Sequence, residues 1–381
     1  MYKENTKNTR IIDYVIRVLH LGQYAKEIRI TDIFTLMRKK QVDAVNGICK
    51  VYDKYAPRAS VIYWLKVMFT FTLIFEGILA YCAYCALVKK SMELSELTIM
   101  TTLMTSATWS LITMFDIVND LRNKCIYIQN ARDFLAYEEK IPEDGEGLIA
   151  PESPKEIEFR NVSFSYAGAE KDSIKDLSMK IRFGERIALV GHNGAGKSTL
   201  IKLLLRLYDP TEGEILLDGV NIKSYSVASY REMFSTAFQD YQIIAMSVLD
   251  NLTMGKSIPD AEKKAEELIS AVGLEKRVSQ MKHGLHNTLT REFDDDGAVL
   301  SGGETQKLAV AKALMQGGKF MIFDEPSAAL DPIAEFELFH TIMEKANDSG
   351  VILISHRLSS VKSADKIYML SGGKVIEEGR H

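Results

Sequence analysis

A glycine-rich segment that ends in lysine, serine and threonine constrains the fold of this chain more than any other feature. Residues Gly191 to Thr199 fill the pattern G-x-x-x-x-G-K-[ST]. The apolar run from Arg186 to Val190 predicts a buried strand before them, and the run from Leu200 to Leu207 predicts a helix after them. A strand, a loop of this pattern and a helix in that order predict a phosphate-binding site.

The residue types of this loop suit a nucleotide. Glycines let backbone N–H groups turn inward around phosphate oxygens, and the start of the helix adds partial positive charge. In this pattern the lysine reaches the β- and γ-phosphates, and the hydroxyl of the next residue, Ser198, ligates Mg²⁺. We expect the nucleotide contacts of the loop to be Gly191, Asn193, Gly194, Gly196, Lys197, Ser198 and Thr199.

A second apolar strand carries two carboxylates at its end. Residues 319–323 predict a buried strand, and Asp324 and Glu325 follow it. At the carboxyl end of a parallel strand Asp324 would lie near the phosphate loop and hold Mg²⁺ through water, and Glu325 would polarise the attacking water. Such a pair alone is often a solvated sheet edge. Its combination with the phosphate loop favours the metal and catalytic interpretation.

Between these two motifs lies a second site for an anion. Residues 299–306 contain Ser301, Gly302 and Gly303, and an apolar helix is predicted from Lys307. Ser301 is a good N-cap, and the glycines expose backbone N–H groups at the start of this helix. Because the phosphate loop already holds a nucleotide in its own chain, this second site predicts a nucleotide shared between two chains.

In this order, the motifs resemble those of the ATP-binding cassette (ABC) family, and residues 300–306 resemble its signature motif. The resemblance implies an ABC-type ATPase domain with a helical subdomain, which binds ATP and Mg²⁺. It implies that Tyr166 stacks on adenine, that Gln239 joins the shell of Mg²⁺ and water, and that Glu325 is the catalytic base. The other implied site residues are His356 at the γ-phosphate, Ser301 to Glu304 in the signature motif, and Asp331 in a loop that crosses the dimer interface.

Two positions depart from the usual pattern of the family. Glu304 stands where many relatives have glutamine, and Lys312 stands where arginine is usual. Arginine and lysine are not interchangeable at a bidentate site. Neither change removes a catalytic group, so we expect ATP hydrolysis.

Two apolar stretches upstream predict membrane-spanning helices. Residues 61–88 and 97–118 are each long enough to cross a hydrocarbon core, which needs about 20 residues. Lys and Arg are frequent on the outer flanks of this pair, which predicts that both flanks are cytoplasmic. The alternative is a pair of buried helices in a soluble domain.

The chain divides into three predicted segments. Residues 1–140 are expected to be part of an exporter membrane domain, and its first 60 residues predict a long amphipathic helix. These residues resemble the cytoplasmic loop of ABC exporters that carries a coupling helix. Residues 141–155 are acidic and rich in Pro and Gly, which predicts a linker. Residues 156–381 are expected to form the ABC ATP-binding domain.

The predicted fold class is therefore an α-helical membrane segment followed by an α/β P-loop NTPase domain. The predicted function is the ATP-hydrolysing subunit of an exporter of peptide, lipid or drug in the cell membrane, with its ATPase domain in the cytoplasm. Its predicted partners are the lipid membrane, an exported substrate and a second ABC half-transporter, identical or different. A net charge of −4 gives no indication of nucleic acid. One alternative is a truncated, non-transporting ATPase or one part of a split transporter. Another is a soluble ABC ATPase that acts on DNA or in translation.

Overall fold

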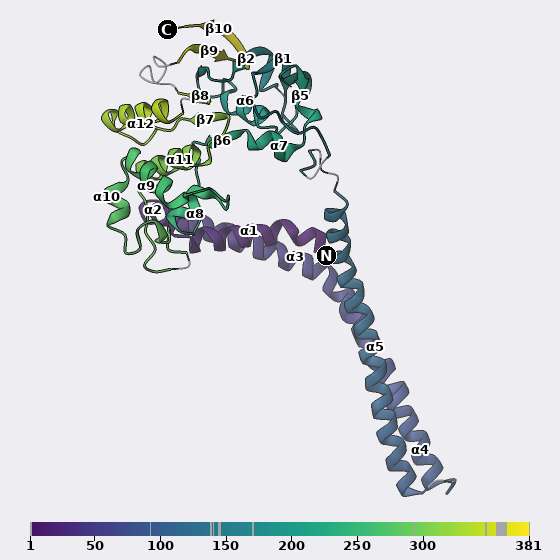
Figure 1. The fold of residues 1–381 in the computed structure, drawn as a ribbon. Helices are drawn as coiled ribbons and strands as arrows, with labels where there is room; N and C mark the ends of the chain where they lie inside the picture. Colours follow the sequence, from purple (N-terminus) through teal and green to yellow (C-terminus); the bar gives the residue numbers. More distant parts are fainter. Residues whose placement is uncertain are drawn as a thin grey trace. The chain divides into compact units, whose positions relative to one another are not determined.

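The computed structural model describes residues 2–91, 93–137, 139, 141–143, 146–169, 171–292, 294–346, 349–355 and 364–380. The chain forms two compact units, Met1–Tyr137 and Glu138–His381 (Figure 1). The first unit is helical in its described part, and the second combines sheets and helices. The predicted fold class, a helical segment followed by an α/β ATPase fold, is confirmed.

The first unit begins with two helices that pack side by side. Val15 and Val18 of α1 are buried, as are Met37 and Ala44 of α3. The ammonium of Lys54 lies 3.1 Å from the carboxylate of Glu4. The single long helix predicted over residues 1–60 is wrong in detail, because turns interrupt it twice. The elements are α1 (Tyr2–His20), the 3₁₀ turn η1 (Gly22–Tyr24), α2 (Ala25–Ile30) and α3 (Ile33–Val67).

The two apolar stretches form the remainder of the first unit. The π-helix η2 (Met68–Glu76) and α4 (Gly77–Leu87) continue α3, and α5 (Leu94–Leu135) returns beside α4 (Figure 1). Lys66 Nζ lies 2.7 Å from Asp116 Oδ1, which joins α3 to α5. The sequence predicted membrane-spanning helices at residues 61–88 and 97–118. In the part of the chain that the structure describes, no helix combines the length and the hydropathy needed to cross a membrane.

The second unit contains two sheets. A six-stranded sheet has the order β10-β9-β3-β8-β7-β6, parallel except at β10, and a four-stranded antiparallel sheet has the order β2-β1-β4-β5. The strands are β1 (Glu156–Phe164), β2 (Ile174–Arg182), β3 (Arg186–Val190), β4 (Glu212–Leu217), β5 (Val220–Asn221), β6 (Phe234–Ala237), β7 (Phe320–Asp324), β8 (Gly350–Ile354), β9 (Lys366–Ser371) and β10 (Lys374–Gly379).

The central strands of the large sheet are buried on both faces. In β7, Phe320 and Ile322 enter one hydrophobic cluster, and Met321 and Phe323 enter another. Successive side chains of a strand point to opposite faces, so a strand covered on both faces is apolar at every position. This is why residues 319–323 predict a buried strand correctly.

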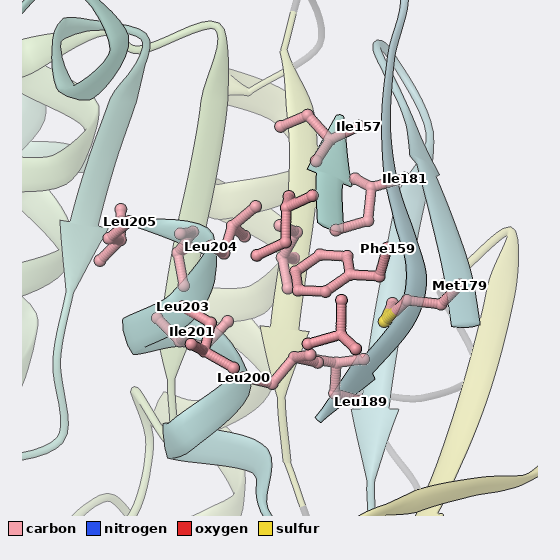
Figure 2. Packing of buried hydrophobic residues seen from close by; sticks show 14 of the residues in the cluster. Ile157, Phe159, Met179, Ile181, Leu189, Leu200, Ile201, Leu203, Leu204 and Leu205 are labelled. Carbon is pink, nitrogen blue, oxygen red and sulfur yellow. The ribbon is translucent and has the colours of Figure 1, made fainter. Parts of the chain in front are cut away.

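Helices cover the two faces of this sheet. The first cluster includes Leu200 and Leu204 of α6 and Phe159 and Ile181 of the small sheet (Figure 2). The second includes the inner sides of the helices that follow β6. The covering helices are α6 (Lys197–Leu204) and α7 (Val227–Glu232), which precede β6, and α8 (Val248–Thr253), α9 (Ala261–Ala271), α10 (Glu275–Ser279), α11 (Gly302–Gln316) and α12 (Pro332–Lys345), which follow it.

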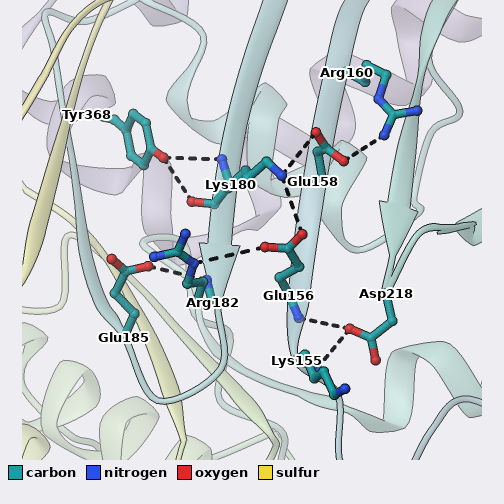
Figure 3. Close-up of polar contacts among 9 residues, drawn as sticks. All are labelled: Lys155, Glu156, Glu158, Arg160, Lys180, Arg182, Glu185, Asp218 and Tyr368. Atoms are coloured by element: carbon teal, nitrogen blue, oxygen red, sulfur yellow. Dashed lines mark hydrogen bonds and ion pairs between the residues drawn. The ribbon is translucent and has the colours of Figure 1, made fainter.

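A buried tyrosine ties the two sheets together. The hydroxyl of Tyr368, on β9, donates to the carbonyl oxygen of Lys180 at 2.9 Å and accepts from its N–H at 3.2 Å (Figure 3). The ammonium of Lys180 lies 3.3 Å from Glu158 and 3.4 Å from Glu156 on the neighbouring strand β1. The small sheet is thereby joined to β9, and side chains of both sheets share the first hydrophobic cluster.

Candidate functional site

The glycines of the phosphate loop are required by close contacts. Gly196, the N-cap of α6, has a φ of 106°, a backbone conformation that residues other than glycine rarely adopt. A Cβ at this position would lie 2.8 Å from Ile174 Cδ1 and 3.0 Å from the carbonyl oxygen of Ser173. A Cβ at Gly191 would collide with the carbonyl oxygen of Leu370. The loop therefore lies directly against neighbouring backbone, where a side chain at these positions would collide.

Lys197 lies inside the curve of this loop. Its side chain is buried, and its ammonium donates to the carbonyl oxygens of Gly191 at 2.6 Å and His192 at 3.2 Å. These two bonds hold the ammonium in place. The structure thus places the Lys197 ammonium where the sequence predicts a phosphate contact.

The sheet brings the two carboxylates to the phosphate loop. β8 lies between β3 and β7, and all three are parallel, so their carboxyl ends meet at one edge. Ile354, the last residue of β8, pairs with Leu189 on one side and with Asp324 on the other. Ser198 and Asp324 line the same cleft, and Ser198 acts to lower the pKa of Asp324. Two predicted Mg²⁺ ligands therefore lie near one another.

The surroundings of Asp324 favour its neutral form. Its side chain is 7% exposed. Burial, together with the charge of Glu325, raises the pKa of Asp324 to about 6, although Lys197 and Ser198 act in the opposite direction. A carboxylate that is costly to ionise gains stability from a cation placed against it. The serine hydroxyl, the carboxylate and an amide oxygen are the hard oxygen donors that suit Mg²⁺.

Asp324→Asn is expected to stabilise the protein in the absence of nucleotide at about pH 7.5. The native carboxyl holds its proton to a pKa of about 6, above its ordinary value of 3.8. The native state therefore binds more protons than the unfolded chain between these pH values, and the free energy of unfolding falls as pH rises through that window. Asparagine does not ionise, so the free energy of unfolding of the variant does not fall in this way.

Thermal unfolding of both purified proteins tests the expectation. The apparent Tm of Asp324→Asn should exceed that of wild type by a few degrees at about pH 7.5, and the gap should narrow at about pH 4.5. An equal Tm at the higher pH would contradict the inferred cost of the charged form.

Glu325 is held in a strained and specific position. Its φ is 48°, a left-handed conformation that costs a non-glycine residue about 1–3 kcal/mol. Its N–H donates to the carbonyl oxygen of Ile354 at 3.0 Å, and its Oε2 accepts from the side-chain amide of Gln239 at 3.0 Å. Two of the three side chains predicted to be catalytic, Gln239 and Glu325, are therefore joined by a hydrogen bond.

These groups line one open cleft of about 1180 Å³. The sequence predicted part of its wall, from Gly191 to Thr199 with Gln239, Asp324 and Glu325. It did not predict the loop before β2 or the β9–β10 turn, where the N–H of Gly373 donates to Ala195 at 3.1 Å. Glycine pairs predict a turn but not its neighbours. The unpredicted lining residues are Lys171, Asp172, Ser173, Lys175, Gly372 and Gly373.

Tyr166 lies beside this cleft rather than among its lining residues. Its hydroxyl is 3.3 Å from Thr199 Oγ1, and its ring meets Phe164 and Tyr208 edge to face, with centroids 4.9 Å and 5.3 Å away. Lys202 Nζ lies 5.6 Å from the centroid of its ring. These contacts fix the ring next to the phosphate loop. Stacking on adenine stays a prediction.

The signature segment begins a helix, as the sequence predicts. Ser301 is the N-cap of α11, and its Oγ accepts from the N–H of Glu304 at 3.3 Å, while Glu304 Oε2 accepts from the N–H of Ser301 at 2.7 Å. This reciprocal capping box explains why glutamate serves at a position where relatives have glutamine. Ser301 was predicted to be the N-cap, but its pairing with Glu304 was not predicted, although S-x-x-E is the sequence signal of a capping box. Arg277 Nε also lies 3.6 Å from the Glu304 carboxylate. No sequence pattern indicates this second contact.

The signature segment lines a second cleft of about 710 Å³, which shares no lining residue with the first. Ser301, Gly302, Gly303 and Asp331 all line it. Asp331 is the N-cap of α12 and accepts from the N–H groups of Ile333 and Ala334, both at 3.0 Å. Within one chain, the two predicted nucleotide sites are therefore separate.

His356 lies outside the described residues, so its predicted contact with the γ-phosphate stays a prediction.

Comparisons with known proteins agree with this geometry. Residues 174–328 match the ABC transporter family model. The chain is 36% identical over 267 residues to the subtilin transport ATP-binding protein SpaT of Bacillus subtilis, which covers 69% of this chain and 43% of that protein. It is 34% identical over 241 residues to the ATP-dependent lipid A-core flippase of Haemophilus influenzae. That match covers 63% of this chain and 40% of the flippase. The chain thus spans less than half the length of these relatives.

A solved structure shares the fold. The structure of a bacterial Atm1-family ABC exporter with ATP bound superimposes with a TM-score of 0.83 at 22% sequence identity. The match covers 100% of this chain and 67% of the exporter chain.

Proposed function

We propose that this chain, which belongs to the ABC transporter family and carries an ABC-type ATPase domain, couples ATP hydrolysis to export across a membrane. The observation that carries the proposal is the single cleft that joins the phosphate loop to Gln239, Asp324 and Glu325. Each of these parts alone occurs in other settings. Their convergence provides what phosphoryl transfer requires, namely positive charge, metal ligands and a base.

Binding of ATP follows from the loop and its surroundings. Backbone N–H groups from Gly191 to Thr199 would surround the phosphates, and Lys197 would contact the β- and γ-phosphates. The fixed ring of Tyr166 would stack on adenine. The second serine-glycine-glycine helix start would bind the γ-phosphate from another chain.

Ser198, Asp324 and Gln239 would hold Mg²⁺, because they offer hydroxyl, carboxylate and amide oxygens. When bound, Mg²⁺ neutralises charge on the β- and γ-phosphate oxygens. Ser198, Gln239 and Asp324 all line the same cleft.

Hydrolysis needs a base for the attacking water, and Glu325 would supply it. The water oxygen bonds to the γ-phosphorus, the bond from that phosphorus to the bridging oxygen breaks, and the water proton passes to the carboxylate of Glu325. The amide of Gln239, 3.0 Å from Oε2, orients the carboxylate. The left-handed backbone of Glu325 holds the side chain in this position.

Two chains would share each nucleotide. Ser301 and Gly303 line a cleft different from that of Lys197, so one chain does not present both to one phosphate. A head-to-tail pair, with an identical or a different ABC half-transporter, would bring each phosphate loop against the other chain's Ser301. ATP would close this pair and hydrolysis would open it.

Residues 61–88 and 97–118 would place the chain in the cell membrane, with the ATPase domain in the cytoplasm where ATP is found. The segment around Asp13 in α1, within the residues that resemble the coupling loop of ABC exporters, would pass the motion of the ATPase domains to these helices. The named relatives act in subtilin transport and on lipid A-core, which directs the search for a substrate to peptides and lipids.

The full-length protein in lipid vesicles tests the proposal. We expect ATP hydrolysis that depends on Mg²⁺ and stops when EDTA is added, together with stimulation by one class in a panel of peptides and lipids. Absence of ATP affinity in the purified protein would overturn the ATPase assignment. ATP hydrolysis without stimulation or uptake of any panel member would count against export.

A further inference from the structure

A lysine of α11 lies on the face of a tyrosine next to the catalytic glutamine. Lys312 Nζ is 4.7 Å from the centroid of the Tyr241 ring. Tyr241 follows Gln239 by two positions in a segment without regular structure, after β6 ends at Ala237. The contact therefore joins this segment to the helix that begins at the signature motif.

Burial makes this contact stronger than a surface pair would be. Lys312 lies between the buried residues Ala311 and Ala313, and burial lowers the pKa of its ammonium. No carboxylate forms an ion pair with Lys312 among the residues that the structure describes. An ammonium over an aromatic face is attracted by the negative charge of the ring, and more so when water is excluded. The ring is thus the charged group's main partner.

The ring of Tyr241, rather than its hydroxyl, makes the contact. The Tyr241 side chain packs against the second hydrophobic cluster, which includes residues of α8, α9 and α11. Its hydroxyl is buried and has no hydrogen-bond partner in the described part of the chain. A phenylalanine would keep the ring and remove only this unsatisfied group.

We propose that Lys312 is a positioning residue that holds the Gln239 segment in place through Tyr241, so that the Gln239 amide stays on Glu325. Lys312 does not line the nucleotide cleft and acts only through this segment. The proposal rests on the proposed ATPase function of that cleft.

The same contact links the two nucleotide sites of a pair. Ser301, at the start of α11, would face the nucleotide of the partner chain, and Lys312, further along the same helix, holds the segment that serves the chain's own nucleotide. Helix α11 packs on β6, the strand that leads into Gln239. A rigid helix with a contact at each site provides the physical connection that coupling between sites needs.

Four variants test the contact by steady-state ATPase kinetics of the full-length protein. Lys312→Met keeps the length of the side chain and removes its charge, and Tyr241→Leu removes the ring. We expect each to lower kcat about 10-fold to 100-fold, as misplacement of a catalytic group does, with little change in the KM for ATP. Lys312→Arg and Tyr241→Phe keep a cation and a ring, and we expect near wild-type kcat.

A matched control separates positioning from general stability. Lys264, on α9, is also partly buried, and its ammonium donates to the carbonyl oxygen of Met315 at 3.0 Å, near the C-terminal end of α11 and away from the Gln239 segment. Lys264→Met should therefore leave kcat unchanged. Thermal unfolding of each variant reports whether the fold survives.

The decisive measurement uses a background without the glutamine. Lys312→Met should have no further effect on kcat in Gln239→Ala, because groups that act as a unit are not additive. The proposal would be overturned if Lys312→Met lowered kcat in Gln239→Ala by the same factor as in wild type. It would also be overturned if Lys312→Met alone left kcat unchanged. The ATPase assignment would stand in both cases. Loss of ATP hydrolysis in wild type would instead remove the function on which the proposal rests.

Discussion

Glu325→Gln is expected to bind ATP as tightly as wild type and to hydrolyse it about 1000-fold more slowly, within the range that general bases contribute. Glutamine has nearly the same shape, so the left-handed backbone and the position beside Gln239 are retained. It has no basic oxygen of comparable strength, so the proton of the attacking water has no acceptor. The change therefore removes an interaction of the transition state and leaves binding intact.

Single-turnover ATPase rates and equilibrium binding of ATP distinguish these effects. Glu344→Gln is the matched control, because Glu344 is exposed and its neighbour His340 is not part of the site. The control should hydrolyse ATP at the wild-type rate. If Glu325→Gln also turned over normally, another group would have to be the base.

Lys197→Ala is expected to weaken ATP binding about 100-fold. A charge-assisted hydrogen bond to an ionised group contributes about 1.5–3 kcal/mol, and about 2.7 kcal/mol corresponds to that factor. The ammonium also holds the carbonyl oxygens of Gly191 and His192, so its loss loosens the loop as well. Both effects reduce affinity, in contrast to the change at Glu325.

Isothermal titration with ATP and Mg²⁺ measures this affinity. Lys282→Ala makes the same change of charge at an exposed position and should bind ATP normally. Lys197→Arg tests whether charge alone suffices, and we expect weak binding because the guanidinium does not fit the narrow loop. Full affinity in Lys197→Ala would contradict the phosphate-loop assignment.

The sequence predicted those parts of the site that depend on local geometry. Only glycine fits at position 196, because its φ is positive and a side chain would collide with Ile174 and Ser173. This requirement is local, so it is visible in the sequence as the glycine of the phosphate-loop motif. The side chains from Phe320 to Phe323 enter two hydrophobic clusters in turn, one on each face of the sheet. Because both faces are buried, the sequence of this strand is an unbroken apolar run.

Contacts between distant segments were beyond the reach of the sequence. The Lys312–Tyr241 contact joins residues far apart in the chain, and neither residue belongs to a pattern that requires the other. The same holds for Arg277 and Glu304 and for Gly373 and Ala195. The breaks at Gly22–Tyr24 and before Ile33 were not predicted, because the apolar pattern of residues 1–60 continues across them.

Mixed pairs of two inactive variants test the central claim that two chains share each nucleotide. Ser301→Asp keeps an N-cap residue for α11 but places a negative charge where the partner's phosphate would lie. We expect this variant and Lys197→Ala to be inactive alone.

The two variants can be produced together with different affinity tags, and the mixed pairs can then be isolated. In a mixed pair, one of the two sites combines an intact phosphate loop with an intact Ser301. The mixed pairs should then recover about half of the wild-type ATPase activity, as expected for one intact site in a symmetric head-to-tail pair. Mixed pairs no more active than either variant alone would contradict the account.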